Sequence, residues 1–173
     1  MRILLLGDIC GPAGMQIIKL KLKKIIDEKK IDFTIANGEN AADNGKSITK
    51  KNFKELIESG VDVITSGNHI WDQKEILEII DKENKIIRPA NLLEGQPGNG
   101  YGIYKIKNKK IAVINLIGNV FMKKSQDLFS FAEKIIKKIK LKKDADFIII
   151  DIHGEITSEK IALGYFLDGK VTT

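Results

Sequence analysis

In the first half of the chain, three short apolar runs are each followed by a polar residue. Asp8, Glu39 and Asn68 close three such runs and lie roughly thirty residues apart, the length of one βαβ unit. Right-handed crossovers of this kind make neighbouring strands parallel, so their carboxyl ends share one sheet edge. Ligands bind at that edge in open α/β sheets. The spacing therefore predicts an α/β fold with a site built from strand ends.

Hydrophobic periodicity and turn residues extend this prediction along the chain. Strands are expected at 3–7, 31–36, 61–65, 101–106, 110–116 and 147–150, with one more beginning at 171–173. Helices are expected at 15–30, 73–82, 126–142 and 157–167, and a further helix is expected to begin after an N-cap at Thr49. The continuous apolar run at 3–7 is typical of a strand covered on both faces. No linker or repeat interrupts the 173 residues, so a single domain is predicted.

Composition argues against a membrane-spanning or disulfide-bonded protein and leaves a nucleic-acid-binding protein open. The net charge is +6, carried mostly by lysines on predicted helices, which favours a solvated helix surface. A nucleic-acid-binding face is the alternative, although no aromatic residues are interleaved with those lysines. No apolar run reaches the ~18 residues that a membrane span needs. A single cysteine, Cys10, excludes an internal disulfide and suits a reducing compartment, so a cytoplasmic location is expected.

Four strand ends carry side chains of types that bind metals. Asp8, Glu39, Asn68 and His153 offer hard oxygen and imidazole donors, which suit Mn²⁺, iron or Zn²⁺. The two oxygens of Glu39 can bridge two ions. In a two-metal site with ions ~3.5–4 Å apart, a bridging hydroxide can attack phosphorus. His69 projects differently from its neighbour Asn68 and is interpreted as the proton donor to the leaving oxygen.

Each of these residues also has a structural interpretation. The alternatives are a cap for Asp8, a solvated turn for Glu39, a left-handed turn for Asn40, an N-cap with a surface histidine for Asn68 and His69, and a hydrogen-bonded near-core histidine for His153. For each residue considered alone, the structural interpretation is favoured over metal binding. Taken together, four polar strand ends of this composition favour a metal site.

Several segments of the chain resemble a known family. They are RILLLGDI at 2–9, IANGENAA at 35–42, GVDVITSGNHIWD at 60–72, RPAN at 88–91, VINL at 113–116, and the stretch 151–169 that begins DIHGEITSEK. The chain is similar in these segments to bacterial metallophosphoesterases of calcineurin-like fold, in the branch of YmdB-type 2′,3′-cyclic-nucleotide phosphodiesterases. The likeness covers nearly the whole chain. It implies an α/β sandwich of two mixed β-sheets flanked by helices.

The resemblance also implies an activity and a set of ligands. Asp8 and Glu39 would bind one metal, and Glu39, Asn68 and His153 the second. Asn40 would lie at the first metal, as a ligand or beside it. His69 would be the catalytic acid or a phosphate contact. The implied cofactors are two manganese or iron ions, and the implied substrates are small phosphodiesters, including 2′,3′-cyclic nucleotides.

The chain departs from the family pattern at three places. A Gly-Thr-His-Thr-His-like segment, which supplies two further histidine ligands in the family, would follow the Leu-Asp-Gly at 167–169, but the sequence ends at Thr173. The resemblance therefore implies an incomplete domain in which each metal lacks one ligand and turnover is slow or absent. Gly154 stands where alanine is expected, a mild change. Asn119 stands where arginine is common, which weakens a phosphate contact.

A non-catalytic nucleotide- or RNA-binding module of the same fold is the alternative function. The sequence leaves the substrate-binding residues open, and the oligomeric state as well, a homo-oligomer included.

Overall fold

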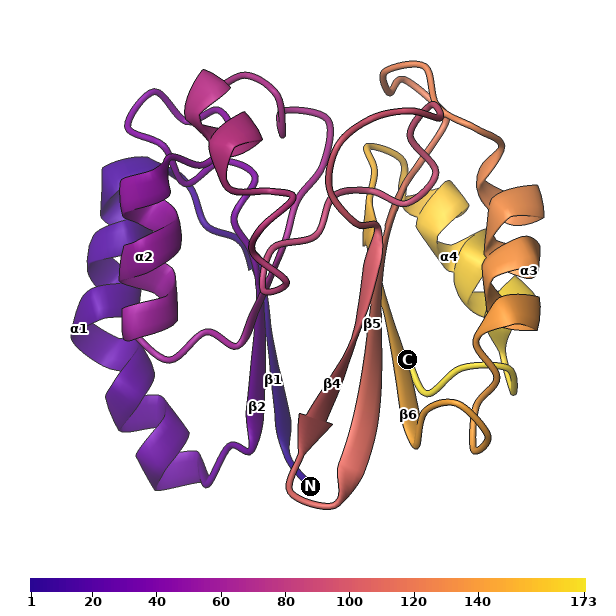
Figure 1. Cartoon of the computed structure of the whole chain (residues 1–173), viewed down its shortest axis with the longest axis horizontal. Helices are drawn as coiled ribbons and strands as arrows, with labels where there is room; N and C mark the ends of the chain where they lie inside the picture. The colour runs from indigo at the N-terminus through magenta and orange to yellow at the C-terminus, as the bar shows by residue number, and fades with distance from the viewer. The chain divides into compact units, whose positions relative to one another are not determined.

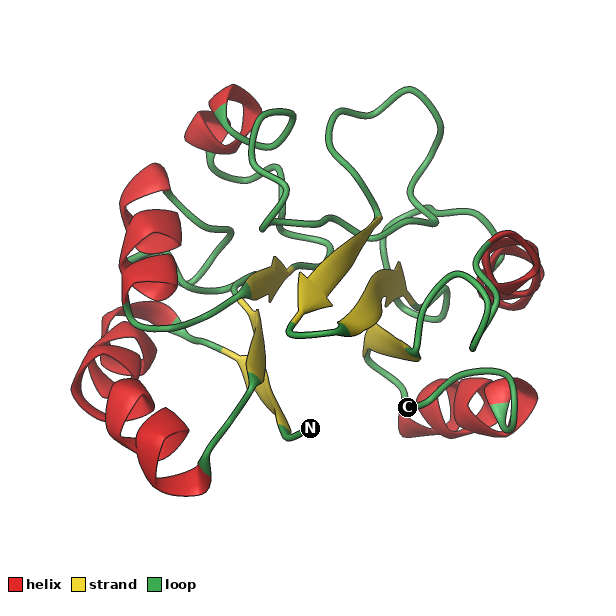
Figure 2. Ribbon diagram, turned by 60° about the horizontal axis from the view of Figure 1, so that its bottom comes forward, coloured by secondary structure: helices red, strands yellow, loops and turns green.

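The computed structural model describes residues 1–173, which form two compact units, 1–86 and 87–173. Each unit contains a three-stranded sheet whose helices cover one face (Figures 1 and 2). The predicted α/β architecture of two sheets flanked by helices is confirmed. The expectation of a single domain stays a prediction.

The sheet of the first unit is parallel throughout. Its strands are β1 (Ile3–Asp8), β2 (Phe33–Asn37) and β3 (Val63–Thr65), in that spatial order. The helices α1 (Gly11–Lys29) and α2 (Lys50–Glu58) lie on the same side of this sheet (Figure 1), and a short 3₁₀ helix, η1 (Lys74–Glu78), follows β3. The parallel crossovers predicted from the thirty-residue spacing are therefore present, and the three strands end at one edge.

Three details of the first unit differ from the sequence prediction. The strand β1, at one edge of the sheet, is not covered on both faces, since Leu5 is 50% exposed. The helix α1 begins at Gly11 rather than near residue 15, with Pro12 in its first turn, where the missing proline N–H costs nothing. The helix expected at 73–82 is only the 3₁₀ segment η1 followed by turns.

The predicted N-cap of α2 is confirmed. The Thr49 hydroxyl accepts a hydrogen bond from the Asn52 backbone N–H at 3.1 Å, and the Asn52 side chain accepts one from the Thr49 N–H at 3.1 Å. This reciprocal pair satisfies two backbone donors that the helix itself cannot satisfy. The start of α2, and hence the length of the loop before it, is fixed by local sequence.

The sheet of the second unit is mixed. β4 (Tyr101–Ile106) and β5 (Lys109–Ile117) form the predicted antiparallel hairpin, and β6 (Phe147–His153) pairs with β5 in parallel. The helices α3 (Leu128–Lys138) and α4 (Thr157–Leu167) cover this sheet (Figure 1) and share its core. Residues 171–173, predicted as the start of a strand, form none, although the N–H of Thr172 bonds to the carbonyl oxygen of Ile148 at 2.8 Å.

A buried amide fixes the carboxyl end of β5. The side chain of Asn91, fully buried, accepts from the Ile117 N–H at 2.8 Å and donates to the Ile117 carbonyl at 2.7 Å. Its amide also lies 3.2 Å from the carbonyl of Gln126, just before α3. One side chain therefore replaces a neighbouring strand at the point where β5 ends.

Replacement of Asn91 by alanine is expected to lower the free energy of unfolding by about 3 kcal/mol, because it leaves a buried N–H and a buried carbonyl without partners. Urea denaturation of the wild type and the variant would measure the loss. The control is Asn99→Ala, since the Asn99 side chain is exposed. Equal midpoints for the Asn91 and Asn99 variants would contradict the assigned role.

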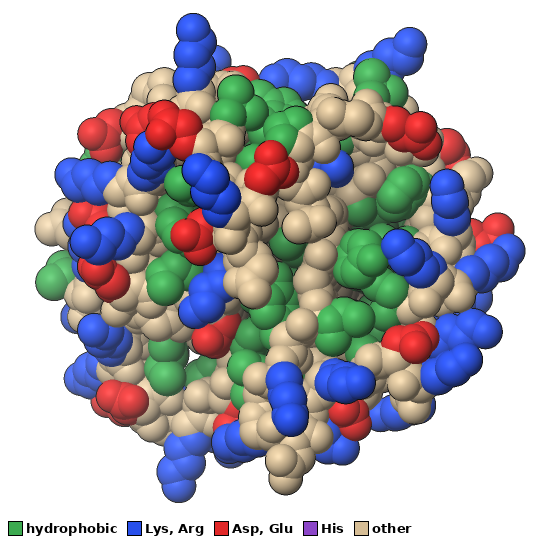
Figure 3. Space-filling model, in the orientation of Figure 1, with side chains coloured by type: hydrophobic (Ala, Val, Ile, Leu, Met, Phe, Trp, Pro, Cys, Tyr) green, Lys and Arg blue, Asp and Glu red, His purple; other side chains and the backbone are tan.

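The surface charges are dispersed. On the face in Figure 3, lysine and arginine side chains alternate with acidic ones over the helices. Several are paired along a helix, such as Lys24 with Glu28 and Lys54 with Glu58. This distribution fits the solvated-surface interpretation of the lysines. None of the helices is long and apolar enough to cross a bilayer.

Candidate functional site

Three of the predicted strand ends meet at the carboxyl edge of the first sheet. The N–H of Ile9 bonds to the Asn37 carbonyl at 2.9 Å, and the N–H of Gly38 bonds to the Thr65 carbonyl at 2.9 Å. These bonds continue the parallel pairing beyond the strands and bring the following turns together. Asp8, Glu39 and Asn68 leave the sheet from these three turns, as the sequence predicted.

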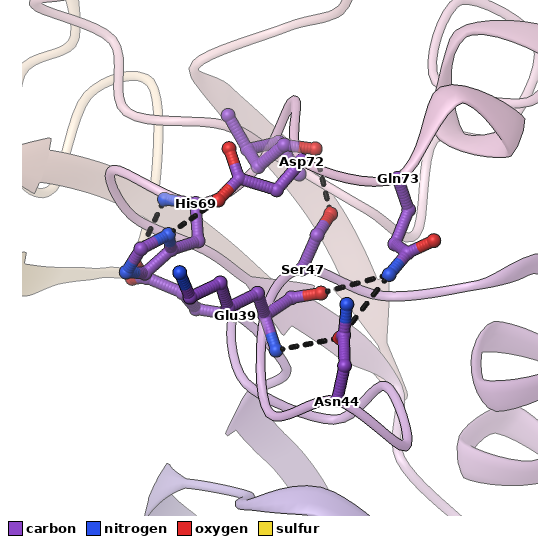
Figure 4. Close-up of polar contacts among 8 residues, drawn as sticks. Glu39, Asn44, Ser47, His69, Asp72 and Gln73 are labelled. Atoms are coloured by element: carbon purple, nitrogen blue, oxygen red, sulfur yellow. Dashed lines mark hydrogen bonds and ion pairs between the residues drawn. The ribbon is translucent and has the colours of Figure 1, made fainter.

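Glu39 lies at the centre of this edge. Its side chain is fully buried, so the interpretation of Glu39 as a solvated turn residue is wrong. The carboxylate oxygen Oε1 accepts the backbone N–H of His69 at 2.9 Å (Figure 4). The Glu39 backbone N–H is itself held by the Asn37 side chain at 2.9 Å. A buried carboxylate is costly without compensating charge or hydrogen bonds, which is consistent with a functional role.

Asp8 and Asn40 form the outer part of the cluster. The Asn40 side-chain amide donates to Asp8 Oδ2 at 3.3 Å, and the Asn40 backbone carbonyl accepts the Gly11 N–H at 2.7 Å. Asp8 does not cap α1, because Cys10 occupies the N-cap position. Asn40 is not a left-handed turn residue, since its φ is not positive. The helix-cap interpretation of Asp8 and the left-handed-turn interpretation of Asn40 are therefore wrong.

His69 is paired with an aspartate to which sequence reasoning gave no role. The ring nitrogen Nδ1 of His69 lies 2.6 Å from Asp72 Oδ2 (Figure 4). An ionised carboxylate can only accept, so this contact places a proton on Nδ1 of His69. The i, i+3 spacing of the two residues in one turn is the sequence signal that could have revealed the pair.

The turn that carries His69 is held by a second loop. The Ser47 hydroxyl donates to the Ile70 carbonyl at 2.8 Å, and the Gln73 amide donates to Asn44 Oδ1 at 3.2 Å (Figure 4). Ser47 is fully buried and has a φ of 65°, a conformation that serine adopts only when surrounding contacts enforce it. Sequence reasoning identified neither contact.

The other two predicted ligands, Asn68 and His153, lie in different units. Asn68 is half-buried in the turn after β3, directly before His69. His153 belongs to the second unit, where it is the last residue of β6 and its carbonyl accepts the Gly118 N–H at 2.8 Å. That His153 joins the other residues at a metal stays a prediction.

The donor types of the first unit fit a divalent metal. Two carboxylates, Asp8 and Glu39, and two amides, Asn40 and Asn68, are hard oxygen donors of the kind that manganese and iron accept. No three Asp, Glu, His or Cys side chains of either unit gather around one point. An ion at this edge would therefore need amide oxygens as well as carboxylates.

The two departures in the second unit have local explanations. The Asn119 side chain is engaged at the start of α3, where Oδ1 accepts the Leu128 N–H at 2.8 Å and the amide donates to Ser125 Oγ at 2.9 Å. Asn119 therefore serves the fold of the loop in which it lies. Gly154 has a non-positive φ, and an added Cβ would make only ordinary van der Waals contacts, the nearest at 3.7 Å.

Substitution of Gly154 by alanine is expected to be tolerated and to raise the free energy of unfolding by about 0.4–1 kcal/mol, because it restricts the unfolded chain. Thermal unfolding would measure the change. The contrasting variant is Gly38→Ala, whose Cβ would lie 2.8 Å from Ile64 Cγ2 and should destabilise. A loss of stability in Gly154→Ala would contradict the conclusion that an alanine methyl group fits at this position.

Comparison with known proteins agrees with the resemblance. The model of the family described as YmdB-like protein matches residues 4–173. A Bacillus subtilis protein named 2′,3′-cyclic-nucleotide 2′-phosphodiesterase is 45% identical over 172 residues, 99% of this chain and 64% of the relative.

Two crystal structures are also similar to the chain. One, of a hypothetical protein from Thermus thermophilus, has a TM-score of 0.91 at 34% identity and covers 99% of this chain and 65% of the other. The second, described as a novel phosphatase from Mycoplasma pneumoniae, has a TM-score of 0.89 at 35% identity. The match covers 98% of this chain and 61% of the other. The chain thus spans a little under two thirds of these relatives' lengths. From the family match, the chain belongs to the YmdB-like protein family.

Proposed function

We propose that this chain carries residues of a metal-dependent phosphodiesterase that hydrolyses small phosphodiesters, with 2′,3′-cyclic nucleotides as the leading candidates. The observation that carries the proposal is the buried Glu39 carboxylate bonded to the turn of His69, which is in turn paired with Asp72. The name of the Bacillus subtilis relative supports the choice of substrate.

Asp8, Glu39, Asn40 and Asn68 would hold the metal. Two divalent ions, manganese or iron, would supply a nucleophile at neutral pH and neutralise charge on the phosphate. The chain's own contribution is to fix these donors, since the Glu39 backbone and carboxylate are both hydrogen-bonded. His153 is predicted to be a further metal ligand, and measurement of metal content in a His153 variant would test this.

His69 would donate the proton that the reaction requires. Hydrolysis of a cyclic diester breaks one phosphorus–oxygen bond to the ribose, and the departing oxygen must gain a proton. Asp72 holds Nδ1 of the His69 ring, so that Nε2 of the doubly protonated ring can deliver its proton to that oxygen. The pair accordingly orients a general acid at the edge where Glu39 lies.

Metal content and turnover together test the proposal. The chain would be expressed with manganese and iron supplied, its metals quantified by elemental analysis, and its hydrolysis of 2′,3′-cyclic AMP followed with and without EDTA. We expect bound metal and product formation that EDTA abolishes. A chain that retains no metal, or that hydrolyses the nucleotide equally well in EDTA, would overturn the proposal.

The alternative, a nucleotide- or RNA-binding module without catalysis, predicts the opposite dependence. Its binding would be independent of metal and would fall steeply with salt, because lysine–phosphate contacts release counterions. The dispersed charges in Figure 3 give this alternative no concentrated basic patch on that face. Fluorescence anisotropy with a labelled oligoribonucleotide at two salt concentrations would separate the two functions.

A further inference from the structure

Glu159 is a buried acid that lies outside the residues of the proposed site. It lies in the first turn of α4, and only 8% of its surface is exposed. Oxygen Oε1 accepts the backbone N–H of Asn119 at 2.8 Å, across forty residues of sequence. Oxygen Oε2 is buried and has no hydrogen-bond partner. A carboxylate in this state costs stability, which points to a role other than stabilising the fold.

Oε2 lies against two glycines. A Cβ built on Gly118 would be 2.3 Å from Oε2 and 3.1 Å from the Glu159 Cδ atom, so only glycine fits there. At Gly154 the same oxygen would be 3.8 Å from an added Cβ, an ordinary contact. The Glu159 carboxylate therefore fills the space between the end of β5 and the turn after β6.

The backbone of Gly118 and Asn119 connects Glu159 to His153. The Gly118 N–H donates to the His153 carbonyl at 2.8 Å, and the next N–H, that of Asn119, donates to Glu159. Two successive amides thus join the last residue of β6 to the first turn of α4. The Asn119 side chain is held at the start of α3, and Asn91 holds the preceding residue, Ile117.

We propose that Glu159 is a positioning residue that fixes the orientation of His153 by holding the Gly118–Asn119 backbone. Its functional consequence rests on the proposed function, in which His153 is a predicted metal ligand. The alternative is a purely structural role, in which the charge of Glu159 only stabilises the N-terminus of α4. The two roles differ in what they require, because positioning needs an oxygen acceptor whereas stabilisation of the helix end needs the charge.

Three substitutions separate these roles. Glu159→Gln keeps an acceptor for the Asn119 N–H and removes the charge, whereas Glu159→Ala removes both. Gly118→Ala keeps the charge and forces the carboxylate away, because of the 2.3 Å contact. The matched control is Glu133→Ala, an exposed glutamate on α3 paired only with Lys137.

The two histidines of the chain make the readout direct. A protein labelled with ¹⁵N-histidine gives ring signals for His69 and His153 alone, assigned with a His69→Gln variant. We expect the His153 signal to move or split in Glu159→Ala and Gly118→Ala, and to stay in place in Glu159→Gln and Glu133→Ala. The His69 signal, from the other unit, should stay in place throughout.

The same variants test the consequence for metal binding. Outer residues that orient a ligand typically contribute 10- to 100-fold in affinity, so Glu159→Ala should weaken Mn²⁺ binding by about that factor in calorimetric titration, and Glu159→Gln by much less. An unmoved His153 signal in a folded Glu159→Ala variant overturns the positioning role, as does a signal that moves equally in Glu159→Gln. Failure of the wild type to bind Mn²⁺ would count against the proposed function alone, because the ring signals are read without metal.

Discussion

Glu39→Gln should abolish metal-dependent hydrolysis and weaken Mn²⁺ binding by at least about 100-fold, more than the loss of a residue that only orients a ligand. The substitution is nearly isosteric and keeps an oxygen that can accept the His69 N–H. It removes only the charge and one potential ligand oxygen. Calorimetric titration with Mn²⁺ and the cyclic-nucleotide assay would measure both effects.

The same substitution should leave the metal-free protein at least as stable as the wild type. Glu39 is fully buried, and an amide is less costly to bury than a carboxylate. Functional residues commonly trade stability in this way, so opposite effects on stability and on metal binding would identify Glu39 as a ligand. The control is Glu58→Gln, on the exposed side of α2, which should change neither. Unaltered metal binding in Glu39→Gln would refute the assignment.

The local features that sequence reasoning predicted well are those set by short segments. The Thr49 cap, the hairpin of β4 and β5 and the bounds of α4 agree with the structure, because capping, turn chemistry and periodicity each act over a few residues. The convergence of Asp8, Glu39 and the turn of His69 was predictable for a different reason. Parallel crossovers allow only one arrangement of successive strand ends.

The features that sequence reasoning missed depend on contacts between distant segments. Nothing near Leu5 indicates that β1 is an edge strand with one face open. The segment after Gln73 has a helical pattern, yet Gln73 itself is engaged with the loop at Asn44, and only η1 forms. The bond of Glu159 to Asn119 spans forty residues, and no local pattern distinguishes that acid from an ordinary one in a first helical turn.

Replacement of His69 by asparagine should lower kcat by about 10²–10⁴ on 2′,3′-cyclic AMP, the usual contribution of a general acid. The ribose oxygen that departs is a poor leaving group and needs the proton. A nitrophenolate leaves without one, so the rate on bis-p-nitrophenyl phosphate should fall much less. Steady-state rates on the two substrates, at a fixed Mn²⁺ concentration, would give the ratio directly.

Asp72→Ala should produce an intermediate loss with the same dependence on the leaving group, because the His69 ring remains but its Nδ1 partner at 2.6 Å is gone. Asp43→Ala, in an exposed loop of the same unit, is the matched control and should behave as the wild type. Equal losses on both substrates in His69→Asn would argue that His69 binds the phosphate rather than donating a proton. Since the Glu39 carboxylate holds the backbone of His69 and Asp72 holds its ring, the leaving-group dependence separates an acid oriented by this pair from a side chain that contributes only binding.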